Sequence, residues 1–467
     1  MNETLATSDV LLAAYEASRG SAGPAWLHVL RAEGLEAYRS LGLPTIRHEE
    51  WRYTSLAPLL KQAWRVPDPS CGAHLRLVDI APLLAAGMDS PRLVFINGRL
   101  CTRLSTQGRL AAGLRYSSLS RTLDDRAGAA VVQAHLGRHA DISTDALAAL
   151  NMAFFEDGAL LHLERGHALD QPLQLLYIAV GRQPALVQPR SLLVLEEGSR
   201  ASVVEIHARL GDCPGLCNHV TEVVVNERAR LAHTLLQPED DAGSQIVQLT
   251  AKVGRGAELE SRVFSLGAAL TRNNLRCVLE GEGANASLSG LFLGRGRQHL
   301  DQHLEVEHAG PLCTSRQLFR GVLDEKSRGV FSGKVVVRPG AQKTNAQQQN
   351  NNLLLSDDAQ IDTKPQLEIY ADDVQCSHGA TSGRLDEEAL FFLRSRGLSQ
   401  AQARSLLTYA FCAELIEAAR HPALRERLAR VVQARFSDPR ELTRPTGRSL
   451  KDTEPGAPAQ TGMSIGG

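Results

Sequence analysis

The feature that most constrains this chain is a repeat of strand-like runs with a period of about 27 to 28 residues. Between about residues 170 and 375, apolar residues alternate with polar ones in short runs that are separated by Gly, Asn and Asp, which is typical of β-strands joined by turns. Aligning the runs on a small residue after each turn gives the series Ala201, Ala229, Ala257, Ala284 and Leu312. A fixed period of this length predicts a β-solenoid, in which similar coils stack on one another.

The regularity of the repeat weakens towards its end. After Leu312 the marks come closer together, at Val330, Ala341, Ala359 and Val374, so we expect the last coils to be less regular. The alternative to a solenoid is a β-sandwich with evenly spaced strands. Aromatic residues make up only 4% of the chain, which suits a core packed by Val, Leu, Ile and Ala.

The run from Gln347 to Asn352 has the composition of a disordered low-complexity segment. It leads directly into the apolar run from Leu353 to Leu355, however, and this placement favours a strand. Amide side chains on neighbouring coils of a solenoid can pair along the stacking direction, as they do in amide ladders. We therefore expect this run to be part of the solenoid.

Helical patterns flank the repeat on both sides. The sequence predicts a helical and mixed N-terminal domain (1–165), the solenoid (166–384), a C-terminal helical domain (385–442) and a disordered tail (443–467). A helix is expected near residues 145–155, and Asn97-Gly98 is a good hairpin turn. In the C-terminal domain, Asp386 and Ser399 are expected to cap the first two helices, and a third is expected over about residues 424–436.

Charge and composition exclude several classes of function. The 51 Lys and Arg residues nearly balance the 52 Asp and Glu residues, so no overall field favours nucleic acid or a membrane surface. Neither a signal peptide nor a membrane-spanning run is visible, and we expect a cytoplasmic protein whose eight cysteines stay reduced. The segment from Gly329 to Val335 lacks the spacing of a phosphate-binding loop, so no nucleotide site is expected.

Two groups of potential metal ligands have ordinary explanations. Cys213, Cys217 and His219 are close enough in sequence to share a soft cation, but the string has no second half and is more often incidental in a Gly-Pro loop. His299, His303 and His308 lie in a strand-like pattern, where structural histidines with satisfied hydrogen bonds are more common than metal ligands. Sequence leaves the role of the first group open.

Cys376-Ser377-His378 is a stronger candidate for chemistry. On a strand, Cys376 and His378 point to the same side, which brings a thiolate and an imidazole within reach of one metal or sulfur species. Asp372 and Asp373, with Glu368, are close enough in sequence to hold iron or to orient the imidazole. The ordinary alternative is a turn in which the cysteine packs inside.

Several segments together resemble one known family. They closely match the SufB/SufD family of iron–sulfur assembly scaffolds, and the match covers most of the chain. The matching segments are 42–45, 49–54, 301–303, 308, 315–316, 319–323, 341–346, 352–369, 371–381 and 385–397. One branch of the family has a cysteine where this chain has Leu393, whereas the SufD branch has the string found here at 376–381, so the resemblance is to the SufD branch.

The resemblance implies a mainly β fold, a right-handed parallel β-helix with helical domains at both ends. It also implies a non-catalytic subunit that pairs with a SufB-like paralogue through the β-helix. A transient iron–sulfur cluster or iron would form at that interface, with His378 as a ligand, Cys376 as a weaker candidate, and Asp372 and Asp373 in support.

The resemblance further implies partners that supply energy and sulfur. A SufC-like ABC-type ATPase would dock on the C-terminal helical region, and a cysteine desulfurase with a sulfur carrier would deliver persulfide sulfur indirectly. The docking residues would be Asp386, Leu390, Leu393, Arg394, Arg396 and Gly397. The sequence leaves open whether reduced flavin binds the complex and whether the isolated chain forms a homodimer, and it indicates no nucleic acid or membrane partner. The alternatives are a purely structural partner of the SufB-like subunit or a carbohydrate-acting β-helix protein.

Overall fold

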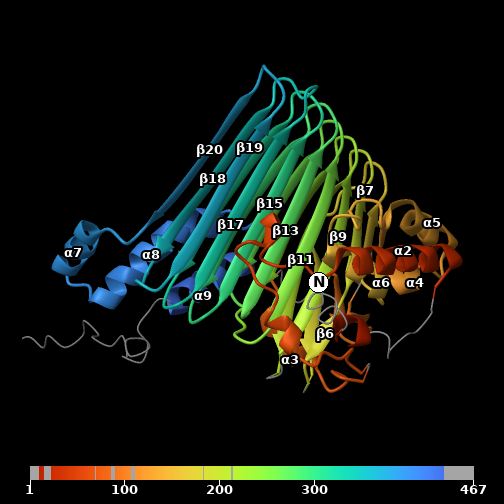
Figure 1. Ribbon diagram of the computed structural model, residues 1–467, viewed down its shortest axis with the longest axis horizontal. Coiled ribbons are helices and arrows are strands. Elements are labelled where there is room, and N and C mark those ends of the chain that lie inside the picture. Colours follow the sequence, from red (N-terminus) through yellow and green to blue (C-terminus); the bar gives the residue numbers. More distant parts are fainter. Residues whose placement is uncertain are drawn as a thin grey trace, which may run out of the picture.

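The computed structural model describes residues 10–14, 23–68, 70–85, 90–106, 111–181, 183–211 and 214–435 (Figure 1). The helices in these ranges are α2 (Ala25–Leu41), α3 (Leu77–Ile80), α4 (Leu119–Thr122), α5 (Arg126–His135), α6 (Ala146–Phe154), α7 (Glu387–Ser395), α8 (Gln400–Glu417) and α9 (Pro422–Arg435), with short 3₁₀ turns η1 (Glu49–Trp51), η2 (Leu59–Lys61) and η3 (Ala81–Leu83). The disordered tail predicted for 443–467 lies outside the described residues.

The described strands belong to two ten-stranded sheets that face each other. Sheet one contains β1 (Arg92–Ile96), β2 (Arg99–Leu100), β5 (Leu173–Val180), β8 (Arg200–Leu210), β10 (Arg230–Gln237), β12 (Glu258–Ser265), β14 (Asn285–Gly294), β16 (Thr314–Leu323), β18 (Asn345–Leu354) and β20 (Gln375–Gly383). Sheet two contains β3 (Leu114–Ser118), β4 (Ala159–Leu163), β6 (Ala185–Val187), β7 (Arg190–Leu195), β9 (Gly215–Val225), β11 (Ser244–Val253), β13 (Leu270–Leu279), β15 (His299–His308), β17 (Arg328–Val337) and β19 (Gln360–Ile369).

From β7 onwards the chain alternates between the two sheets, so each coil contributes one strand to each, and neighbouring coils pair in parallel. This confirms the predicted solenoid and the mainly β fold. In sheet one, successive strands from β8 to β20 begin at Arg200, Arg230, Glu258, Asn285, Thr314, Asn345 and Gln375, which is a spacing of 27 to 31 residues. The expected loss of regularity after Leu312 is wrong. The later marks are more closely spaced because Val330 and Ala359 lie in or directly before strands of sheet two, whereas Ala341 and Val374 precede strands of sheet one.

The turns before the strands of sheet one stack in register, and they explain the repeat. From β8 to β18, the second residue before each strand has a left-handed backbone, for example Gly256 with φ 60° and Leu312 with φ 59°. Its N–H donates to a carbonyl of the next coil, from Gly256 to Glu282 at 2.9 Å and from Leu312 to Gln342 at 2.9 Å. Glycine is found at three of these six positions, and it fits there because it lacks the Cβ that resists a positive φ. The next residue is the small, buried one, so Cys313 rather than Leu312 is the correct mark.

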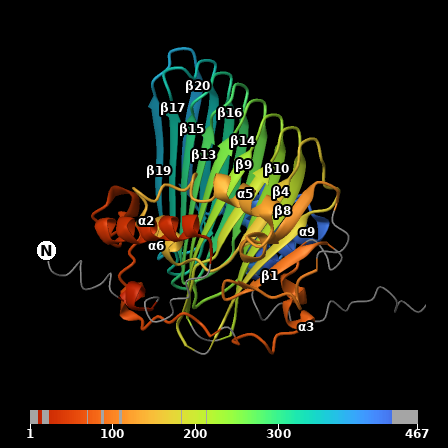
Figure 2. The same cartoon turned by 90° about the vertical axis from the view of Figure 1, so that its right-hand side faces the viewer.

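The inner faces of the two sheets form the main core, and it contains mostly Leu, Val and Ala. Helices cover the outer faces on opposite sides of the stack (Figure 2). Helices α2, α5 and α6 pack on sheet two around β4, β7 and β9, whereas α8 and α9 pack on sheet one. Within the described residues, no helix combines the length and apolar character needed to cross a membrane.

Several local predictions are confirmed. Asn97-Gly98 joins the antiparallel strands β1 and β2, and Asp386 and Ser399 cap α7 and α8. The amide-rich run lies in β18, where Gln348 Nε2 donates to Gln317 Oε1 of the preceding coil at 2.8 Å. This amide pair lies along the stacking direction, as expected for a ladder.

The three histidines of β15 are satisfied structural residues, as the strand pattern predicted. His299 Nε2 lies 2.8 Å from Thr54 Oγ1, and His303 Nε2 lies 2.5 Å from Glu50 Oε2. His308 is buried and its Nε2 lies 2.8 Å from Ser315 Oγ. Two segments of the family signature, 49–54 and 301–303, therefore contact each other in the fold.

Candidate functional site

The solenoid ends at two strands, β19 and β20, each of which has a neighbour in its sheet on one side only. In Figure 1 they lie at the end of the stack opposite the N-terminal helices. In β20 every residue except Cys376 is exposed. Unpaired strand edges and the uncovered face of a last coil are surfaces on which another chain can add. We call β19 and β20 the terminal strand pair.

Cys376 and His378 lie on the same face of β20, as predicted, but their surroundings differ. The parallel register aligns Cys376 with Ala346 and His378 with Gln348 of β18. Cys376 is half-buried against a small apolar cluster, and burial raises the pKa of its thiol. His378 is exposed, and within the described ranges we find no hydrogen bond or ion pair to it. The imidazole is therefore available to a ligand without breaking an internal contact.

The acidic residues near this pair have other contacts. Asp373 forms an ion pair with Lys343, and the Lys343 N–H donates to the Asp373 carbonyl at 2.6 Å. Glu368 pairs with Lys334 at 2.9 Å. Asp372 is exposed in the turn before β20. In the described structure neither aspartate makes a hydrogen bond or ion pair with His378, so their support of this residue stays a prediction.

The predicted docking residues lie on α7 and at its two ends. Asp386 Oδ1 accepts hydrogen bonds from the N–H groups of Glu388 and Ala389, Leu390 is buried and Leu393 is half-buried. Three residues, Arg394, Arg396 and Gly397, are exposed, and Gly397 has a left-handed φ of 95° that ends the helix.

Sequence reasoning missed the most exposed apolar residues of α7. Phe391 is 73% exposed and Phe392 is 55% exposed, although aromatic residues are rare in this chain. Together with Asp386, Glu388 and Ser395 they line a shallow hollow. Two exposed phenylalanines on one short helix mark a surface for contact with another protein.

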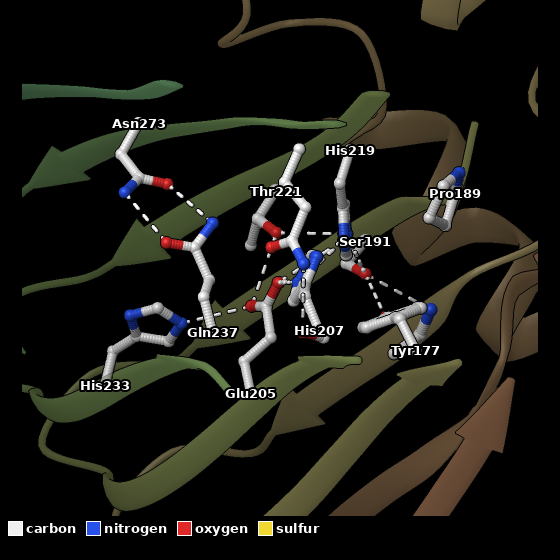
Figure 3. A network of polar contacts seen from close by, with 12 residues as sticks. Tyr177, Pro189, Ser191, Glu205, His207, His219, Thr221, His233, Gln237 and Asn273 are labelled. Carbon is white, nitrogen blue, oxygen red and sulfur yellow. Dashed lines mark hydrogen bonds and ion pairs between the residues drawn. The ribbon is translucent and has the colours of Figure 1, made fainter. Parts of the chain in front are cut away.

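A second group of chemically capable residues lies inside the solenoid, far from any chain end in sequence. Glu205 and His207 on β8 and His219 on β9 point towards one another (Figure 3). The structure places Cys217 and His219 on strand β9, so the expectation that they lie in a Gly-Pro loop is wrong. Cys213 lies outside the described residues. Glu205 and His207 gave no signal because their partners lie about half a coil away in the sequence.

Comparison with known proteins gives a consistent result. The family model of the SufBD core domain of SUF-system FeS cluster assembly matches residues 177–411, and that of the SufBD N-terminal region matches residues 14–175. The iron–sulfur cluster assembly protein SufD of Escherichia coli is 35% identical over 425 residues, which are 87% of this chain and 95% of that protein. A SufBD family protein of Synechocystis, slr0076, is 33% identical over 85% of this chain and 88% of its own length. SufD of Bacillus subtilis is 23% identical over 88% of this chain and 94% of its own.

Proposed function

Since the chain belongs to the SufB/SufD family of iron–sulfur cluster assembly proteins and is SufD-like within it, we propose that it is a non-catalytic scaffold subunit on which nascent clusters form as cargo. The observation that carries the proposal is His378, an exposed imidazole on the last strand of the stack that makes no hydrogen bond or ion pair in the described structure. Imidazole nitrogen is a suitable ligand for iron and can be released more readily than thiolate.

A SufB-like paralogue is the partner that would complete this site. The terminal strand pair offers open edges to a second solenoid, and Leu393 stands where the other branch of the family has a cysteine. A thiolate from the partner and His378 from this chain would then hold iron between the two subunits. Cys376 is the weaker ligand because its thiol is half-buried and its pKa is raised by burial.

Energy and sulfur would come from other proteins. We infer that a SufC-like ABC-type ATPase docks on the C-terminal helices, and Phe391 and Phe392 support this because they expose apolar surface on α7. Asp386, Arg394 and Arg396 would surround that contact as its polar rim. Persulfide sulfur would reach the interface from a cysteine desulfurase through a sulfur carrier.

The test is anaerobic cluster reconstitution on the complex of this chain with its SufB-like and SufC-like partners. We expect His378→Ala to leave the complex intact and to remove most of the cluster absorbance. The matched control is His74→Ala, which removes another exposed histidine on the N-terminal segment and should leave the cluster yield unchanged.

Two results would contradict the proposal. An unchanged cluster yield with His378→Ala would make the chain a purely structural partner of the SufB-like subunit. Failure of the wild-type chain to co-purify with either partner would remove the scaffold assignment as a whole.

A further inference from the structure

The solenoid interior contains a cluster of histidines around one carboxylate that the proposed function does not use (Figure 3). Glu205 Oε1 lies 2.6 Å from His207 Nε2 and 3.4 Å from His219 Nδ1, and these two nitrogens are 3.1 Å apart. All three side chains are at least nine-tenths buried, at 1%, 1% and 0% exposure. In the described part of the chain, no Lys or Arg makes an ion pair or hydrogen bond with Glu205, whose partners there are imidazoles and the Thr221 hydroxyl.

Three potential ligand atoms of this cluster converge on one another. The 2.6 Å contact requires a proton between His207 Nε2 and the Glu205 carboxylate. His219 Nδ1 faces the same two atoms, so an N–H on it would crowd that of His207 at one carboxylate oxygen, and a lone pair on it would repel the carboxylate. A single cation in place of the proton would satisfy all three atoms at once.

The triangle formed by the three atoms has the size that a metal ion requires. With edges of 2.6, 3.1 and 3.4 Å, an ion about 1 Å out of the plane would lie about 2.05 Å from every corner, which is the usual length of a bond from zinc or iron to nitrogen or oxygen. We propose that Glu205, His207 and His219 bind one divalent transition-metal ion, iron(II) or zinc(II), inside the solenoid. Two imidazoles and a carboxylate on one face are a recurring ligand set for these ions, whereas calcium and magnesium prefer oxygen alone.

Neighbouring side chains hold the three ligands in orientation. His233 Nε2 lies 3.1 Å from the second carboxylate oxygen of Glu205. His219 Nε2 lies 3.1 Å from Ser191 Oγ, which lies 2.5 Å from Tyr177 Oη. Hydrogen bonds on the far side of metal ligands are usual, because they fix the tautomer of an imidazole and the direction of a carboxylate.

A small cavity next to the cluster provides room for further ligands. It has a volume of about 20 Å³, which is enough for one water molecule. Its lining includes His207, Cys217 and Gln245, and it extends to Arg209 and Asp240. Two buried atoms of these residues, His207 Nδ1 and Gln245 Oε1, have no hydrogen-bond partner among the described residues. A metal-bound water in the cavity would give Gln245 Oε1 a donor.

The test is cobalt(II) titration of the full chain after removal of bound metal with a chelator, with cobalt as a coloured substitute for iron or zinc. We expect one equivalent to bind with the absorption of a tetrahedral or five-coordinate site and to raise the melting temperature. In Glu205→Gln and His219→Gln, each checked for a wild-type circular dichroism spectrum, affinity should fall by more than about 100-fold. His74→Ala, an exposed histidine elsewhere, should bind as wild type does.

Other outcomes would overturn the site. Wild-type protein that binds no stoichiometric cobalt, zinc or anaerobic iron(II) has no such site. Retention of the ion by folded Glu205→Gln and His219→Gln protein, or its loss on His378→Ala, would place the bound ion elsewhere. If every interior variant unfolds, the rise in melting temperature on addition of metal still tests the site. An equal rise in the wild type and in His378→Ala supports an interior site, and no rise in the wild type contradicts it. The inference does not rest on the proposed function, because no partner or cluster is involved.

Discussion

The two histidine regions of this molecule differ in how many coils enclose them. His219 lies on β9, which has β7 and β11 as neighbours in its sheet, and it is fully buried. His378 lies on β20, which has a neighbour on one side only, and it is exposed. The same residue type on the same kind of strand is thus part of the core in one coil and exposed in another. Position along the stack decides whether a side chain is enclosed by its own chain or open to a second one.

The largest difference between the two regions should appear on removal of the buried carboxylate. We expect Glu205→Ala to lower the free energy of unfolding of the metal-free chain by about 3 to 5 kcal/mol, because three imidazoles lose their common partner in a buried site. Urea unfolding followed by circular dichroism measures this. The control Glu258→Ala removes a half-exposed carboxylate of β12 and should change stability by less than about 0.5 kcal/mol. A loss below about 1 kcal/mol for Glu205→Ala would show that the interior tolerates this change as a surface does.

The enclosed region should also make stability depend on pH. His219 has a folded-state pKa of about 3 against 6.5 for an ordinary histidine, so between these values the unfolded chain binds one more proton there. Stability should therefore fall as the pH falls below 6.5, by about 1.4 kcal/mol per pH unit from this residue. In the metal-free chain, His219→Gln should reduce the slope between pH 6 and pH 5 by that amount, in a range above the titration of the carboxylates. An unchanged slope would mean that His219 is hydrated in the folded state.

A substitution on β18, between the enclosed coils and the last strand, should change the free energy of unfolding by an intermediate amount. Asn352 on β18 is buried, and its Nδ2 donates to Asn350 Oδ1 at 2.6 Å and to the Thr381 carbonyl of β20 at 3.3 Å. Asn352→Ala should cost about 1 to 2 kcal/mol, because it removes a buried hydrogen bond to Asn350 and the hydrogen bond to the last coil. Gln349→Ala, on the exposed face of the same strand, should be neutral within about 0.5 kcal/mol. Equal effects of the two changes would mean that the last coil is already open to water at β18.

The sequence was sufficient to predict the solenoid because its turns repeat. The left-handed position and the small residue after it recur before every strand of sheet one from β8 to β18. The marks keep the period even though Ala201 lies two residues after the small residue Ser199 and Leu312 lies one residue before Cys313. Helix caps such as Asp386 are equally local, and their prediction is confirmed. The amide-rich run could be assigned to a strand because its neighbours in sequence are apolar.

The interior cluster could not be predicted in the same way. Glu205 meets His219 because β8 and β9 face each other across the core, and it meets His233 because the next coil stacks at a particular register. A shift of one residue in either strand would turn these side chains outwards. The string from Cys213 to His219 pointed to metal chemistry, but the residues that complete the set, Glu205 and His207, lie on another strand. Phe391 and Phe392 were missed for a related reason, since a helical pattern alone does not show which face lacks a neighbour.

The smallest change in stability should come from removal of the His378 side chain. An exposed imidazole without internal contacts adds little to stability, so His378→Ala should change the free energy of unfolding of the isolated chain by less than about 0.5 kcal/mol. Urea unfolding beside His74→Ala measures this. A loss above about 1 kcal/mol would show that His378 supports the last coil, and a defect in cluster assembly would then have a structural cause. With stability unchanged, any such defect must arise at the interface, because the isolated chain does not depend on this side chain.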